Sequence, residues 1–170
     1  MQEILIVDGY NIVNDWPELV ELKRDSFEHA RDKLLDILVN YQGLTGYCIV
    51  VVFDAHLVRH GTRSREKYSG VEVIFTQEGE TADSCIERLV TLIPEEIRVT
   101  VATSDWAQQR LVMGKGALRL SARELFISIK EVEKRGQLAS KTYQKRATVI
   151  DDVIRADLKS VLERWRRRKK

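Results

Sequence analysis

The sequence predicts an α/β fold in which a central, mostly parallel sheet is flanked by helices. Short apolar runs of strand length alternate with segments whose apolar residues recur at helical spacing. Acidic residues follow several of the strand-like runs directly. Strands that alternate with helices are typical of a parallel sheet with right-handed crossovers. At 170 residues, the chain is long enough to form one domain with a sizeable core.

The first half of the chain contains three strand-like runs and one long helical segment. Ile4–Val7, Tyr47–Phe53 and Val71–Phe75 are short apolar runs rich in β-branched residues, and they predict buried strands. Leu19–Tyr41 carries apolar residues at helical spacing and predicts a helix. Residues Ala55–Gly70 are polar and basic, and we expect a long loop there that is either functional or disordered.

The second half continues the alternation. We expect, in order, a helix at Thr81–Ile93, a strand at Ile97–Ala102, a helix at Trp106–Met113, a short edge strand at Ala117–Leu120 and a helix at Ser121–Arg135. The last helix opens with Ser121 and has Glu124 three residues later, which is the signature of a capping box. Together, these elements complete the predicted parallel sheet and its covering helices.

The net charge of +2 hides an asymmetry along the chain. Residues 131–170 hold 13 Lys and Arg against 6 Asp and Glu, whereas residues 1–130 hold 15 against 20. Apolar residues recur at helical spacing through Ile150–Arg168, so a basic C-terminal helix is predicted at about residues 149–170. An acidic body with a basic C-terminal segment indicates either a surface that meets a polyanion or a solvated helix end.

The composition argues against a membrane or secreted protein. No apolar run approaches the length of a membrane span, and the N-terminus lacks the pattern of a secretory signal. Cys48 and Cys85 lack the CxxC spacing of a zinc or redox site. We therefore expect reduced thiols in a cytoplasmic protein.

Five acidic residues follow strands of the predicted sheet. Asp8, Asp54 and Asp105 come directly after strands or within a few residues of them, and Glu80 and Asp83 lie where the next helix begins. Because the carboxyl ends of parallel strands meet at one edge of the sheet, we expect these side chains to lie together. A cluster of oxygen ligands without Cys or His suits Mg²⁺ or Mn²⁺. Such a site indicates metal-assisted hydrolysis of a phosphodiester.

Each of these residues also has a purely structural interpretation, and the residues alone leave both open. Asp105 has the position of a helix cap, Asp83 that of a first-turn acid favoured by the helix dipole, and Asp54 that of an Asx turn. Asn11 either orients Asp8 or is a turn residue. We expect the glycine after Asp8 to allow a tight turn there.

Other site chemistries find less support. The turn after the first strand has no glycine fingerprint for a dinucleotide, and the chain has no GxxxxGK[ST] loop. Tyr10 stands two residues after Asp8, where phosphatases with an aspartyl nucleophile carry a second Asp. Three hypotheses remain: a metal-dependent nuclease, a non-catalytic module that binds RNA or the ribosome, and a small-molecule phosphohydrolase.

Four motifs, in this order, resemble the YacP-like branch of the NYN domains, which are PIN-like ribonucleases: "ILIVDGYNIV", "VVVFDAH", "FTQEGETADSCIERLV" and "VTVATSDWAQQ". The resemblance covers nearly the whole chain, from Ile4 to about the last helix. It implies a PIN-like three-layer sandwich, a single nuclease domain over residues 1–170, and an acidic site that binds one or two divalent ions. This branch includes a bacterial endoribonuclease that cuts translated mRNA in the ribosomal A site, so the resemblance implies RNA cleavage on the ribosome.

The resemblance also implies roles for particular residues. Asn11 matches the asparagine of the D-G-Y-N motif. The acids that match the metal-binding core are Asp8, Asp83 and Asp105, and those that match accessory acids are Asp54 and Glu80.

A polyanion needs cations to approach so acidic a site. Basic side chains in the Ala55–Gly70 segment are suited to phosphates, and an aromatic ring there is suited to stacking on a base. A solvated loop without such contacts is the other interpretation. The candidate RNA-binding residues are Arg59, Arg63, Arg65, Lys67 and Tyr68, with a second group at Lys141, Lys145 and Arg146.

Overall fold

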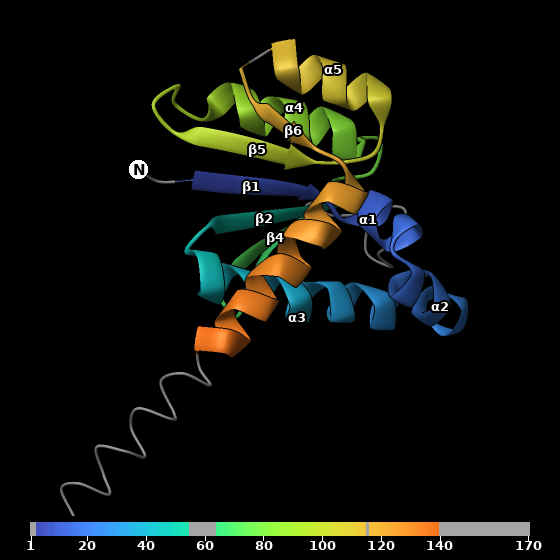
Figure 1. Ribbon diagram of the computed structural model, residues 1–170. Helices are drawn as coiled ribbons and strands as arrows, with labels where there is room; N and C mark the ends of the chain where they lie inside the picture. Colours follow the sequence, from blue (N-terminus) through green and yellow to red (C-terminus); the bar gives the residue numbers. More distant parts are fainter. Residues whose placement is uncertain (1–2, 55–63, 115, 140–170) are drawn as a thin grey trace, which may run out of the picture. The chain divides into compact units, whose positions relative to one another are not determined.

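A computed structural model describes residues 3–54, 64–114 and 116–139 (Figure 1). The chain divides into two compact units, residues 1–132 and 133–170, and the sheet lies in the first. Residues 122–139 form one helix, and its last seven residues are the described part of the second unit. The basic helix predicted at about residues 149–170 lies outside the described residues.

The sheet has six strands in the order β3-β4-β2-β1-β5-β6. Every neighbouring pair is parallel except β3 and β4, which are antiparallel. The prediction of a mostly parallel sheet is confirmed. The strands are β1 (Glu3–Asp8), β2 (Cys48–Phe53), β3 (Ser64–Tyr68), β4 (Val71–Phe75), β5 (Arg98–Ala102) and β6 (Leu118–Leu120).

Helices from both ends of the first unit cover one face of the sheet (Figure 1). They are α1 (Gly9–Asp15), α2 (Pro17–Asp25), α3 (Phe27–Thr45) and the start of the helix at residues 122–139. Leu5, Val7 and Val51 point to this face and are buried against Leu34 and Leu125. Alternate residues of the central strands thereby bury one apolar surface.

The opposite face of the sheet is covered by α4 (Ala82–Leu92), with α5 (Trp106–Gly114) beside it (Figure 1). Ile6, Val52 and Val101 form a second core with Cys85 and Ile86 of α4. Because both faces of the sheet are buried under helices, the strands read as continuous apolar runs. The predicted three-layer α/β sandwich is confirmed.

The predicted helix Leu19–Tyr41 consists of two helices. α2 ends at Asp25 and α3 starts at Phe27, with Ser26 between them in an extended conformation (φ −159°, ψ 127°). The Ser26 Oγ accepts a hydrogen bond from the His29 N–H at 3.4 Å and so caps α3. Apolar residues recur at helical spacing on both sides of Ser26, so the sequence pattern does not reveal the break.

The predicted loop Ala55–Gly70 contains a strand, β3, at its C-terminal end. Ser69 and Gly70 both have positive φ (48° and 102°) and connect β3 to β4, as in a two-residue type I′ hairpin turn. β3 is an edge strand of charged residues, which protect an open edge from pairing with another chain. The polar composition of β3 is typical of a loop, and for this reason the sequence did not predict a strand there.

The helix at residues 122–139 is anchored at its start. The Ser121 N–H donates to Glu124 Oε2 at 2.7 Å, and the Glu124 N–H donates to Ser121 Oγ at 3.2 Å. The predicted capping box is therefore confirmed. The buried Trp16 indole donates to the Ala122 carbonyl at 2.8 Å and packs edge-on against Phe126. These bonds fix the helix start against the junction of α1 and α2.

Two further expectations concern the cysteines and the membrane. No disulfide joins Cys48 and Cys85. Cys85 is buried on the side of α4 that faces the sheet, as expected of a structural thiol. None of the described helices is both long and apolar enough to cross a membrane.

Candidate active site

Asp8 ends β1 and is buried, with only 7% of its surface exposed. Its side chain caps α1, since Oδ1 accepts a hydrogen bond from the Asn11 N–H at 3.1 Å. Gly9 follows in the first turn of α1, where an added Cβ would lie 2.3 Å from Cε1 of Phe53. Because φ at Gly9 is not positive, the glycine serves this close approach to Phe53 and not the tight turn expected from the sequence.

The charges of neighbouring carboxylates raise the pKa values of Asp8 and Asp83. The pKa of Asp8 is raised to about 6, chiefly by burial, against the lowering effect of the Asn11 N–H; the charges of Asp83, Asp105 and Asp54 raise it further. The pKa of Asp83 is also raised, by burial first and then by the charges of Asp105 and Asp54. The charges of Asp8, Asp54, Asp83 and Asp105 thus act on one another's titration, as expected of acids at one edge of the sheet.

The topology explains this convergence. β1 lies between β2 and β5, so the carboxyl ends of these three parallel strands are neighbours. Asp54 follows β2 and Asp105 follows β5 after a short loop, while Asp83 is in the first turn of α4. The N-cap of α4 is Thr81, whose Oγ1 accepts a hydrogen bond from the Ser84 N–H at 3.2 Å. Strand ends and one helix start therefore place all four acids.

Asn11 joins two loops of the site. Its side-chain Oδ1 accepts a hydrogen bond from the Ser104 N–H at 2.8 Å, while its own N–H donates to Asp8. In the same loop, Thr103 Oγ1 accepts from the Asp105 N–H at 3.1 Å. Asn11 thereby connects the residue after β1 to the segment that carries Asp105.

Glu80 has a different partner. Its Oε1 lies 2.5 Å from Arg88 Nη1 in an ion pair, and only 8% of the Glu80 side chain is exposed. Its other oxygen, Oε2, is buried, and the role of Glu80 as an accessory ligand stays a prediction.

The donor set fits a hard divalent ion in its chemistry. All four side chains offer oxygen, and their mutual repulsion is relieved by a cation. Asp54 Oδ1 is buried and accepts no hydrogen bond within the described part of the chain, so it has capacity for a ligand. No group of three or more His, Cys, Asp or Glu among the described residues stands close enough to hold an ion as it is.

The predicted RNA-binding residues divide into three groups. Arg65 and Lys67 of β3 pair with Glu72, at 2.9 Å and 3.9 Å. Tyr68 ends the antiparallel β3, so it lies at the end of the sheet away from the carboxylates, where its hydroxyl donates to Asp36 at 2.8 Å. The others, Arg59, Arg63, Lys141, Lys145 and Arg146, lie outside the described residues.

Gln109 of α5 supports the site and was not found from the sequence. It is buried, its amide Nε2 donates to the Thr103 carbonyl at 2.5 Å, and its Oε1 accepts from Arg119 at 3.4 Å. A glutamine one helical turn after Asp105 was the available signal, but helix periodicity does not distinguish a buried amide from an exposed one.

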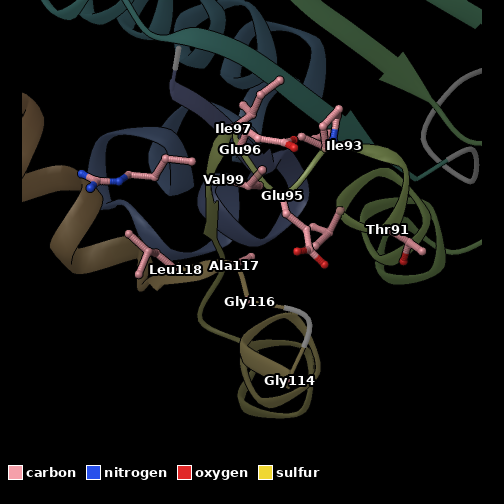
Figure 2. Close-up of a pocket in the computed structure, with 13 residues that line it drawn as sticks. Thr91, Ile93, Glu95, Glu96, Ile97, Val99, Gly114, Gly116, Ala117 and Leu118 are labelled. Carbon is pink, nitrogen blue, oxygen red and sulfur yellow. The ribbon is translucent and has the colours of Figure 1, made fainter. Parts of the chain in front are cut away.

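A groove of about 1140 Å³ lies at the other end of the sheet (Figure 2). It is lined by the end of α4, the start of β5 and the segment around Gly116, and Glu95 and Glu96 are among its lining residues. None of the predicted site residues lines it. The groove is therefore separate from the carboxylates.

Comparison with known proteins places the chain in a family. A family model described as the YacP-like NYN domain matches residues 5–167. The chain belongs to the YacP-like NYN domain family. NYN domains are part of the PIN-like nuclease superfamily, so this NYN domain is a nuclease domain.

Members of the family from Bacillus subtilis are similar in sequence and fold. The protein YacP of strain 168 is 43% identical over 168 residues, which cover 97% of each chain. The crystal structure of Rae1 (YacP) is 41% identical with a TM-score of 0.72, over 96% of this chain and 94% of that one. A crystal structure of a mutant of Rae1 (YacP) is 46% identical with a TM-score of 0.69, over 79% of each chain.

Proposed function

We propose that the protein is an endoribonuclease that hydrolyses RNA phosphodiester bonds with Mg²⁺ or Mn²⁺. Its substrate is mRNA on translating ribosomes in the cytoplasm, and the nuclease domain spans residues 1–170. The observation that carries the proposal is the meeting of Asp8, Asp54, Asp83 and Asp105 at one edge of the sheet in a chain of a nuclease family. The basic character of residues 131–170 supports contact with a polyanion such as ribosomal RNA.

Asp8, Asp83 and Asp105 would hold the ion, with Asp54 as an accessory ligand through its buried Oδ1. The ion, when bound, supplies Lewis acidity that activates water and offsets negative charge on the phosphate. Asp8 is the most buried of the four, so its charge acts where water screens least. Asn11 is a positioning residue, since it couples Asp8 to the Asp105 loop.

The test is RNA cleavage by the parent and by Asp83→Asn. We expect cleavage to require Mg²⁺ or Mn²⁺ and to fall on the order of 1000-fold in Asp83→Asn, because several kcal/mol of charge stabilisation are lost. Asp25→Asn is a matched control, because Asp25 is an exposed carboxylate at the end of α2. Equal cleavage by folded Asp83→Asn and parent would refute the site assignment.

Cleavage ends mapped on translating ribosomes would identify the substrate. We expect ends that depend on Asp83 and on translation. A protein that binds RNA with salt dependence but never cuts it, with or without divalent ions, is a binding module instead. A protein that turns over small phosphate esters and is indifferent to charge reversal in the Arg59–Lys67 segment is a phosphohydrolase.

Asn11→Ala is expected to lower RNA cleavage while the protein stays folded. It removes the acceptor of the Ser104 N–H, which costs about 1 kcal/mol because that bond is exposed to water. The Asp105 segment loses its tether to Asp8, so RNA cleavage should fall on the order of tenfold while chemical denaturation shows a nearly intact fold. Cleavage that falls only in proportion to the unfolded fraction would contradict this role.

A further inference from the structure

The four carboxylates create a difficulty for an RNA substrate, which brings further negative charge. Most described cations on the helices beside the site are already paired: Arg24 with Glu21, Arg31 with Asp32, and Lys33 with Glu18. A cation that serves a phosphate near the site needs to be free of such a carboxylate.

Lys23, near the end of α2, meets this requirement. Its ammonium contacts Asn14 Oδ1 at 2.5 Å and lies 5.0 Å from the centre of the Tyr10 ring. Both partners are neutral, and Lys23 contacts no carboxylate in the part of the chain that the structure describes. A cation held over an exposed ring is bound weakly, so the ammonium can exchange the ring for a phosphate.

Tyr10 lies two residues after Asp8, in the first turn of α1, and 37% of its surface is exposed. Its ring is 5.9 Å from that of Phe27, which in turn packs edge-on against Phe53 at 6.1 Å. Phe53 directly precedes Asp54. The exposed ring therefore packs on a row of aromatic rings that leads to Phe53, the residue before Asp54.

Asn14 fixes this pair. Its Nδ2 donates to the Tyr10 carbonyl at 2.9 Å, and its Oδ1 accepts from Lys23. The Tyr10 hydroxyl makes no hydrogen bond within the described structure, so the fold does not need it as an anchor. An exposed ring with an adjacent uncompensated ammonium is the combination that proteins use to bind one nucleotide of a single strand.

We propose that Tyr10 and Lys23 form a nucleotide-binding subsite next to the carboxylates, in which the Tyr10 ring stacks on a base of single-stranded RNA and the Lys23 ammonium binds its phosphate. This subsite rests on the proposed function. It adds the requirement that the RNA substrate has an unpaired nucleotide beside the bond that is cut. Stacking is tolerant of base identity, so the subsite selects single-stranded over paired RNA.

The experiment measures binding rather than cleavage. A fluorophore-labelled, unstructured RNA oligonucleotide is titrated with the full-length Asp83→Asn protein and with Tyr10→Ala, Tyr10→Phe, Lys23→Gln and Lys33→Gln in that background. Lys33→Gln is the matched control, since it removes the same charge from a lysine already paired with Glu18. Each titration is repeated over a range of salt concentrations.

Tyr10→Ala is expected to weaken binding about tenfold or more, whereas Tyr10→Phe keeps the ring and the affinity. Lys23→Gln should reduce the slope of log affinity against log salt by about 0.7, the value for one phosphate of a single strand, and Lys33→Gln should not. If folded Tyr10→Ala binds RNA with unchanged affinity and Lys23→Gln leaves the salt slope unchanged, the subsite is refuted and the proposed nuclease function is not. A parent that neither binds nor cuts RNA overturns the proposed function as well.

Discussion

Replacing Asp8 by asparagine is expected to stabilise the ion-free protein at pH 8 by about 2 kcal/mol while abolishing RNA cleavage. Asp8 is buried and its pKa is raised from 3.8 to about 6, mainly by burial, with further repulsion from three other carboxylates. The ionised side chain therefore destabilises the folded state, and either protonation or a bound cation removes this cost. Asparagine is neutral, has nearly the same shape, and caps a helix as well as aspartate does.

The sign of the pH dependence follows from the two pKa values of Asp8. Between pH 3.8 and about 6, the folded state keeps a proton that the unfolded chain has released. Stability therefore falls as the pH rises through this window, and the loss is complete above about pH 6. The shift corresponds to at most about 3 kcal/mol, and some of it is recovered by relaxation around the carboxylate.

Thermal unfolding in the presence of a chelator tests this prediction. Asp8→Asn should melt about 4–8 °C above the parent at pH 8, and the difference should narrow steadily towards zero as the pH falls to 4. Saturating Mg²⁺ should raise the melting temperature of the parent but not of the variant. Glu96→Gln is the control, because Glu96 is exposed at the groove away from the site. An Asp8→Asn protein that melts below the parent at pH 8 without ions would contradict the assignment of strain to Asp8.

The fold and the meeting of the acids could be predicted because both follow from local patterns. The apolar runs that became β1, β2, β4 and β5 are long enough to be strands and too short for buried helices. Once those strands are parallel, Asp8, Asp54 and Asp105 are at one edge of the sheet by topology alone. Nothing beyond the order of elements was needed for that step.

What could not be predicted depends on contacts between distant segments. The pairing of Glu80 with Arg88 depends on how the turn before α4 folds back on the helix. Gln109 is buried and Tyr10 is exposed because of the distant segments that pack against each of them, which the local sequence does not reveal. The strand β3 is hidden because an edge strand needs only one neighbour and keeps charged side chains.

The substitution Gly9→Ala is expected to destabilise the protein by on the order of 2 kcal/mol, although alanine is the better helix former. The new Cβ would lie 2.3 Å from Cε1 of Phe53 and within 2.7 Å of two other atoms of its ring. Phe53 is fully buried, stacks on Phe75 at 5.8 Å and meets Phe27 edge-on, so the ring has no space to move into. The start of α1 must move instead, and Asp8 moves with it.

The matched control is Gly43→Ala in α3, where an added Cβ meets nothing within 4 Å. There the helix propensity of alanine acts alone, and we expect a gain of up to about 1 kcal/mol. Chemical denaturation of the two variants should therefore give changes of opposite sign. RNA cleavage should fall in Gly9→Ala even where the protein is fully folded, because Asp8 no longer stands where the other carboxylates converge. A Gly9→Ala protein as stable and as active as Gly43→Ala would show that the contact with Phe53 does not position Asp8.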